Sequence, residues 1–383
     1  MRGRNLIILL LSLAAVAGVA ALILMGKGQG PRRSVQGSSL LPHLPVGEVA
    51  SVTIKSAGNS VSLVKQEDGW VIRQRFDYPA DLSKIAGLVH ELEEAKVGRK
   101  FEGSEEILKR LALKDPGDPQ ASEVEKGIRV VLSAQGEKVL ASVLLGGLWQ
   151  GAPLPDTRRF VGRYLRLAES NTVYLVDGKF QGVKGDPASW FDHQLVEEVN
   201  PAEVKRITCG TSDGKRTLYT FERRGPGKQL EAASLPPSVR FKADELRQLA
   251  NGLASLVAED VAGPAAGPAA AAFPLRIDYQ LFDGTNYRVY FCRDCSQNGK
   301  NQCLLRLEAS YEEPAADKKE EAAGQGKGAE KRAKGSAEEL AAEAKRLNER
   351  VNPWIYVVPW TKYYAFHTNL HLFLGPVKKS GEK

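Results

Sequence analysis

The chain contains few of the residues from which most catalytic and metal sites are built. It has four cysteines and five histidines among 383 residues. It also lacks the GxxxxGK[ST] pattern of phosphate-binding loops, the HExxH pattern of zinc proteases and the GxSxG pattern of serine hydrolases. Acidic pairs such as Glu93-Glu94 have no apolar surroundings that would tune one carboxyl for acid–base catalysis. The sequence therefore predicts no enzyme, no catalytic residue, no metal ligand and no cofactor.

Basic residues are in excess, but they form no dense cluster. The net charge is +7, and the lysines and arginines are interleaved with 46 acidic residues. A nucleic-acid-binding protein usually gathers its basic residues on one surface with aromatic side chains between them. We therefore predict solvated surface charge and no nucleic-acid partner. A hydrophobic content of 43% allows one large core or two ordinary ones.

The N-terminus predicts a membrane anchor. Leu6–Met25 contains no charged residue and is long enough to cross a bilayer as a helix. A cleaved signal peptide is the alternative, because Ala17-Gly-Val-Ala20 could be cut by a peptidase. The apolar run continues past that point, which favours an uncleaved anchor. We therefore expect residues 1–26 to form a single-pass inner-membrane anchor, residues 27–46 to form a linker, and the rest of the chain to lie outside the cytoplasm.

The remainder reads as two related α+β units, residues 47–198 and residues 199–383. In each, strand-like segments with alternating apolar residues are combined with one or two amphipathic helices, which predicts an antiparallel sheet with packed helices. Four segments of the first unit have counterparts in the second, in the same order along the chain. The pairs are 48–53 with 203–208, 80–85 with 243–249, 128–130 with 275–277, and 163–170 with 303–310.

The second unit differs from the first by a charged insertion at residues 311–353. Its first part has no residues able to build a core, whereas Ser336-Ala-Glu-Glu339 is a capping box that predicts a helix. One face of this helix carries Leu340, Ala344, Leu347 and Val351. The insertion is either a tolerated loop expansion or a helix on which a partner docks. Residues 261–272, VAGPAAGPAAAA, are interpreted as a spacer of small residues.

Three of the cysteines lie close together in the second unit. Cys292, Cys295 and Cys303 could hold a metal, but a structural zinc site usually has four ligands. The Cys292/Cys295 pair could be a redox centre, although such pairs usually open a helix after a strand. An exported location favours a disulfide. Cys292 and Cys303 would face each other across the loop of a hairpin, and we predict this pair as a structural disulfide.

These features together resemble a known family. The anchor is followed by EVASVTIK, DGWVI, YPADLSKI, RYLRL with VYLVD, and SWFDHQL, and the pattern begins again at NPAEVKRIT. They resemble a bacterial envelope family of unknown function, often encoded beside ABC transporters of the gliding-motility type. The resemblance covers residue 46 to about residue 195 well and the second unit more loosely. It implies an anchored periplasmic protein that works with a transporter complex, without catalytic residues.

Three hypotheses about function follow. The leading one is a non-enzymatic scaffold or accessory subunit that is anchored in the membrane and binds another envelope protein. The second is a module that binds a cell-wall glycan or another polyanion, favoured by the positive charge and by Trp149, Trp190, Trp354 and Trp360. The third, a thiol redox protein using Cys292 and Cys295, is the least favoured.

Overall fold

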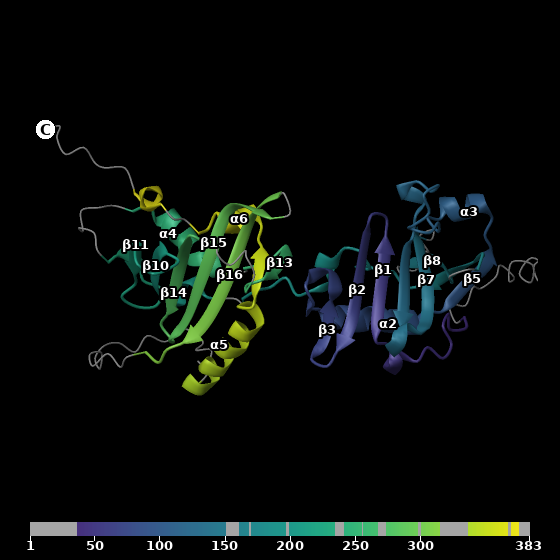
Figure 1. Cartoon of the computed structure of the whole chain (residues 1–383), viewed down its shortest axis with the longest axis horizontal. Coiled ribbons are helices and arrows are strands. Elements are labelled where there is room, and N and C mark those ends of the chain that lie inside the picture. The colour runs from purple at the N-terminus through teal and green to yellow at the C-terminus, as the bar shows by residue number, and fades with distance from the viewer. Residues whose placement is uncertain are drawn as a thin grey trace, which may run out of the picture. The chain divides into compact units, whose positions relative to one another are not determined.

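The computed structural model describes residues 37–150, 161–167, 170–196, 199–233, 241–254, 256–266, 273–297, 300–314, 336–366 and 369–374. The chain divides into two compact units (Figure 1). Within the described residues, unit 1 comprises 37–60 and 83–185, and unit 2 comprises 61–82 and everything from Asp186 onwards. The predicted membrane anchor, Leu6–Met25, lies outside the described residues. None of the helices in the described ranges has the length and apolar character needed to cross a bilayer.

Among the described residues, the first sheet has nine strands in the order β4-β3-β2-β1-β6-β7-β8-β9-β5. Its neighbouring strands run antiparallel, for example β1 with β6 and β5 with β9. Two helices accompany it, α2 (Leu82–Glu94) and α3 (Glu105–Arg110). The strands are β1 (Ser51–Ser56), β2 (Asn59–Gln66), β3 (Gly69–Ile72), β4 (Tyr78–Pro79), β5 (Val97–Glu102), β6 (Ile128–Ser133), β7 (Val139–Gln150), β8 (Val161–Leu167) and β9 (Thr172–Asp177).

The second sheet has eight strands in the order β12-β11-β10-β14-β15-β16-β17-β13, again antiparallel. Its helices are α4 (Ala243–Ala250), α5 (Ala337–Val351) and α6 (Trp360–Tyr363). The strands are β10 (Val204–Thr211), β11 (Thr217–Glu222), β12 (Glu231–Ala232), β13 (Asp260–Pro264), β14 (Leu275–Leu281), β15 (Thr285–Gln297), β16 (Lys300–Tyr311) and β17 (Trp354–Val357).

The two sheets repeat one order of elements. β1, β2, α2, β5, β6, β7, β8 and β9 correspond in sequence order and in sheet position to β10, β11, α4, β13, β14, β15, β16 and β17. In both, the strand that follows the helix pairs with the last strand at the far edge of the sheet, β5 with β9 and β13 with β17. The four matching segments of the sequence fall on corresponding elements, so the predicted α+β repeat is confirmed at the level of sheet topology.

Each sheet has an inner face that packs on helices. In the first sheet, Val52 and Ile54 of β1 are fully buried, and α2 buries a stripe at helical spacing, namely Ile85, Leu88, Val89 and Leu92. In the second, Tyr279 Oη donates to the Leu249 carbonyl of α4 at 2.9 Å, and the ring of Phe291 stacks on that of Phe366 at 5.9 Å between centroids. We call the opposite side of each sheet its outer face.

Residues 61–82 belong to unit 2 although they come early in the chain. Arg75 forms a two-bond ion pair with Asp260, with N–O distances of 2.5 and 2.7 Å. The hydroxyls of Tyr78 and Tyr356 lie 3.3 Å apart in a buried position. Paired guanidinium and carboxylate groups of this geometry fix both distance and orientation, so these two contacts explain why the segment is grouped with unit 2 although its strands belong to the first sheet.

One expectation about the connections is wrong. The small-residue stretch beginning at Val261 is not entirely a spacer, because Asp260–Pro264 forms β13. Val261 and Ala262 are buried, and the strand pairs with β17. A sequence of Gly, Ala and Pro has little strand preference of its own, and the neighbouring strand supplies the pairing that fixes it.

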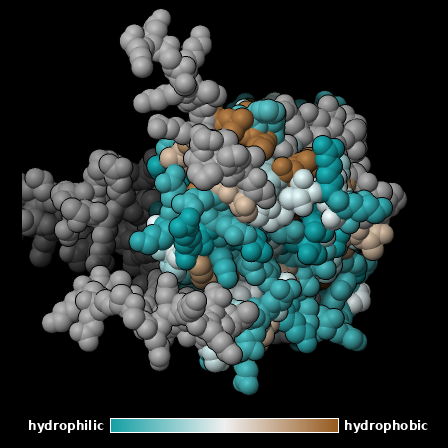
Figure 2. All heavy atoms as spheres, turned by 90° about the vertical axis from the view of Figure 1, so that its left-hand side faces the viewer, coloured by the Kyte–Doolittle hydropathy of each residue, from teal (hydrophilic) through white to brown (hydrophobic). Residues whose placement is uncertain are grey.

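The surface agrees with the predicted distribution of charge. The coloured residues on the side shown in Figure 2 are largely hydrophilic, with hydrophobic residues in small patches. Ion pairs between exposed residues occur in unit 2, for example Arg73 with Asp77 and Arg206 with Glu222. Such pairs each contribute about 0–1 kcal/mol to stability, so their main effect is to keep the surface hydrophilic.

Candidate functional site

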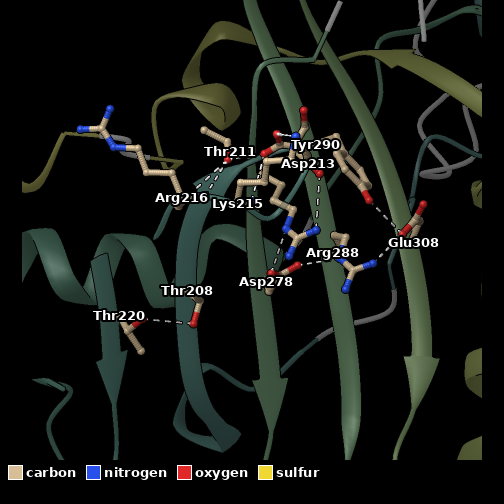
Figure 3. A network of polar contacts seen from close by, with 12 residues as sticks. Thr208, Thr211, Asp213, Lys215, Arg216, Thr220, Asp278, Arg288, Tyr290 and Glu308 are labelled. Carbon is tan, nitrogen blue, oxygen red and sulfur yellow. Dashed lines mark hydrogen bonds and ion pairs between the residues drawn. The ribbon is translucent and has the colours of Figure 1, made fainter. Parts of the chain in front are cut away.

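The outer face of the second sheet carries rows of charged and hydroxyl side chains that cross its strands (Figure 3). Successive side chains of a strand point to opposite faces. In β14, Ile277 and Tyr279 are buried on the inner face, so Arg276 and Asp278 lie on the outer one. We call this surface the polar face. Its residues are Thr208, Thr220, Arg276, Asp278, Arg288, Tyr290, Arg306 and Glu308.

One row of the polar face runs through five strands in register. Thr208 lies opposite both Thr220 and Asp278, and the row continues through Arg288 to Glu308. Arg288 Nε donates to Asp278 Oδ1 at 2.8 Å, and its Nη1 donates to Glu308 Oε2 at 3.3 Å. One guanidinium therefore bridges carboxylates on two flanking strands, which couples β14, β15 and β16.

The neighbouring row consists of Arg276, Tyr290 and Arg306, which are register partners on β14, β15 and β16. The Arg306 guanidinium lies over the Tyr290 ring, 5.0 Å from its centroid, in a cation–π contact. Its Nη2 also donates to Asn352 Oδ1 at 2.9 Å, at the end of α5. Arg276 Nε lies 3.2 Å from Asp278 Oδ2. This row thus places one cation on each side of an aromatic ring.

Two carboxylates form ion pairs with three guanidiniums on this surface. Asp278 pairs with Arg276 and Arg288, and Glu308 pairs with Arg288 and Arg306. Burial alone lowers the pKa of Arg288, but the hydrogen bond and charge of Asp278 outweigh burial and raise it. Each guanidinium carries five N–H donors, whereas the carboxylate oxygens are already engaged within the sheet. The polar face is therefore rich in donors and positively charged.

The turn between β10 and β11 adjoins this surface. Arg276 Nη1 donates to the Ser212 carbonyl at 3.4 Å. Asp213 Oδ1 accepts from Thr211 Oγ1 at 2.6 Å and from the Lys215 amide at 3.0 Å, and these bonds lower the pKa of Asp213. An aspartate bonded to the backbone two residues on is a common way to fix a tight turn. The turn therefore holds the edge of the polar face in place.

The corresponding region of the first sheet is built differently. Residues 103–127, between β5 and β6, form what we call the covering segment, which contains α3. Leu108 and Leu113 of this segment are buried against Leu144 of β7 and Val173 of β9. These apolar contacts attach the segment to the outer face, because a buried leucine side chain contributes about 1.5–3 kcal/mol relative to an exposed one.

The covering segment also supplies charge to two arginines. Asp115 forms an ion pair with Arg129 of β6. Burial and the nearby Arg129 lower the pKa of Arg166, while Asp115 and Glu105 act in the opposite direction. The outer face of the first sheet therefore has its cations balanced by a segment of the same chain.

The predicted Cys292–Cys303 disulfide is wrong. Cys292 is disulfide-bonded, whereas Cys303 and Cys209 are buried thiols. Cys292 lies opposite Leu304, so Cys303 is one residue out of register and points to the other side of the sheet. Burial raises the pKa of Cys209 to about 12, against a hydrogen bond from Tyr219 that lowers it. The side chain of Cys295 lies outside the described residues, so the redox hypothesis for Cys292 and Cys295 stays a prediction.

The predicted helix in the insertion is present as α5, and its capping box is formed by Ser336 and Glu339. Its apolar face packs partly on unit 2, and its role as a docking helix for a partner stays a prediction. Ala344 and Val351 are buried, and Leu340 and Leu347 are half-buried. Asn348 Oδ1 accepts from the Ala309 amide of β16 at 3.0 Å. The helix therefore covers the edge of β16 beyond the point where pairing with β17 ends, which protects an otherwise open strand edge.

The other candidate residues do not come together. Trp190 is buried, Trp149 and Trp354 are half-buried, and Trp360 is exposed. Within the described part of the chain, no group of three or more His, Cys, Asp or Glu residues is arranged to hold a metal ion. Sequence reasoning did not single out the polar face. Its signal is the alternation of charged and apolar residues in LRIDYQL and YRVYF, but the rows become visible only when the register of the strands is known.

Comparison with known proteins places the chain in a family. A family model described as "Domain of unknown function (DUF4340)" matches residues 70–274, which is more than half of the chain. The chain therefore belongs to the DUF4340 family, in agreement with the expected family of unknown function. The match extends from β3 through the covering segment to the residue before β14. No curated protein and no solved structure is significantly similar to the chain.

Proposed function

We propose that this DUF4340 protein is a non-enzymatic accessory subunit, anchored in the inner membrane, that binds another protein of an envelope complex. The observation that carries the proposal is the polar face, which presents two ordered rows of cations, carboxylates and one aromatic ring on a sheet. Rows of this kind on a sheet suit the surface of another macromolecule, because complementary charge sets register and partner choice. Arg288 and Arg306 are each held by two or more polar contacts, which reduces the entropy lost on binding.

The location and the kind of complex rest on the sequence. Leu6–Met25 supplies the anchor, and the family resemblance points to an ABC transporter complex of the gliding-motility type. In this account the anchor keeps the folded units close to the membrane, where a tethered binding site meets its partner at high effective concentration. The fold provides the surface, and the anchor provides the location.

The test is to purify the tagged full chain from membranes that have been solubilised in a mild detergent. The account expects it to elute in a stoichiometric complex that includes a membrane transport component identified by mass spectrometry. Removal of residues 1–26 should release the chain from the membrane fraction. Recovery of the bare monomer under gentle conditions and low salt would overturn the proposal.

A second candidate function is binding to a cell-wall glycan or another polyanion. The excess of guanidiniums on the polar face favours it, together with the exposed Trp360, since aromatic side chains can stack on flat ligand surfaces. Retention of the chain on purified envelope material that is released by moderate salt would support this function. Retention that does not depend on salt would count against it.

A further inference from the structure

The first sheet contains a row of residues at the position equivalent to one row of the polar face, and it shows which side chains pack on a row at this position. In the first sheet, Arg129 lies opposite Leu144, which lies opposite Arg166. In the second, Arg276 lies opposite Tyr290, which lies opposite Arg306. Because β6, β7 and β8 correspond to β14, β15 and β16 in the shared strand order, these two rows occupy equivalent positions.

In the first sheet, the row is completed by the covering segment. Asp115 places a carboxylate on Arg129, and Leu108 and Leu113 pack on the central Leu144. A segment that combines acidic and apolar side chains is therefore what this position of the fold accepts. The covering segment belongs to the same chain as the row, so its contacts with the row form when unit 1 folds.

The equivalent connection in the second sheet is shorter. It consists of residues 265–274 between β13 and β14, where the first sheet has residues 103–127 between β5 and β6. Phe273 of this connection belongs to a buried cluster with Cys292, Leu304, Ile355 and Val357, and one side of Tyr290 packs against that cluster. Arg276 and Arg306 instead rely on Asp278 and Glu308, which they share with Arg288.

We propose that the polar face is the docking site for an acidic segment of a partner protein, which places carboxylates on Arg276 and Arg306 and an apolar side chain beside Tyr290. The partner thus supplies in trans what the covering segment supplies to the first sheet. This inference rests on the proposed protein-binding function and names the chemistry of the partner. A protein segment fits better than a uniform polyanion, since the central position of the row is a partly buried aromatic ring between two cations, which offers apolar surface as well as charge.

The chain itself provides the probe. A fluorescein-labelled peptide of residues 104–126 carries the apolar residues of the covering segment with six acidic and four basic side chains. Its binding to the full chain in detergent is followed by fluorescence anisotropy. The double variant Arg276→Glu/Arg306→Glu is expected to weaken binding by about tenfold or more, since each reversed charge turns attraction into repulsion. The matched control is Arg224→Glu, which reverses an exposed arginine away from the polar face and should leave the affinity unchanged. Thermal unfolding of each variant verifies that it is folded.

The apolar part of the proposal is tested with the peptide. A version with Leu108→Ser and Leu113→Ser keeps every charge and should bind about tenfold more weakly, because it removes the contact with Tyr290. Heparin serves as the polyanion arm. Tight heparin binding that is lost in the double variant, with equal binding of the two peptides, would assign the surface to a polyanion and overturn the proposal.

Absence of peptide binding at about 1 mM, or equal affinity of wild type and double variant, would also overturn it. These outcomes can be told apart from failure of the proposed function. If the membrane complex forms and the double variant leaves it intact, the accessory role stands and this docking site is wrong. If no complex forms from membranes, the accessory role itself is wrong.

Discussion

The two sheets share one strand order, yet their outer faces differ. The first buries part of its outer face under residues 103–127, while the second carries the polar face at the equivalent position. The difference arises from the connection between the edge strand and the next strand, which is long in one and short in the other. Paired strands define the layers of such a fold, and a connection can cover part of the face of a sheet, as residues 103–127 do in the first sheet.

The largest expected effect tests whether the covering segment is part of the core of unit 1. Leu113 is fully buried in its apolar cluster. Leu113→Ala should lower the free energy of unfolding of unit 1 by about 2–5 kcal/mol, through lost burial and the cavity that remains. Urea unfolding followed by amide exchange in β6 and β7 measures it.

Tyr290→Phe, at the equivalent region of the second sheet, removes one hydroxyl and should cost about 1 kcal/mol or less. If the two variants lost the same free energy of unfolding, the proposed difference between the two outer faces would be contradicted.

A smaller effect is expected from the charge that the covering segment supplies. Asp115→Asn removes the partner of Arg129, whose Nε is buried without a hydrogen-bond partner among the described residues. The expected loss is about 1 kcal/mol in unit 1, because the pair is partly exposed and screened by solvent. Glu106→Gln, an exposed change in the same segment, should cost less than about 0.5 kcal/mol. A loss as small for Asp115→Asn as for this control would show that the ion pair contributes nothing.

The polar face should matter less for stability than for binding. Arg288→Gln removes the bridge between Asp278 and Glu308 but keeps an uncharged polar side chain at this position. The expected change in the free energy of unfolding of unit 2 is about 1 kcal/mol or less, because the pairs face solvent. Thermal unfolding measures it. A loss of several kcal/mol would mean that the row is a structural brace rather than a binding surface.

The smallest expected effect is a loosening of the covering segment in acid. Asp118 and Glu125 accept backbone bonds from Gln120 and Ser122, which lower the pKa of both carboxyls. The stability that they contribute is fully present above their ordinary values of 3.8 and 4.5 and is lost as the pH falls through the lower folded values. Amide-exchange protection at Gln120 and Ser122 should therefore fall in that range. Asp118→Asn should flatten the change at Gln120; an unaltered pH dependence there would rule out this cause.

The chain order of many of the strands and helices could be predicted from the sequence because it depends on local patterns. Alternating apolar residues mark β1 and β10, and helical spacing with a capping residue marks α2 and α5. The capping box of Ser336 and Glu339 is confirmed in detail. These signals lie within a few residues of one another, so they need no knowledge of the partner strand.

Features that depend on pairing between distant segments were missed. Strand β13 consists of small residues and forms through its pairing with β17. The disulfide was assigned to the wrong thiol because a shift of one residue in the register of β15 and β16 turns a side chain to the other face. The rows of the polar face depend on the registers of four strand pairs at once. The packing of α5 on β16 likewise depends on the edge of β16, which local sequence patterns do not show.

The most direct test of the central claim is chemical footprinting of arginines with phenylglyoxal in the complex isolated from membranes. In the dissociated chain Arg276, Arg288, Arg306 and the exposed control Arg224 should all react. In the complex the first three should be protected at least about tenfold while Arg224 reacts as before. Equal reactivity of the polar-face arginines in the two states would contradict the account, because it would place the partner somewhere else on the molecule.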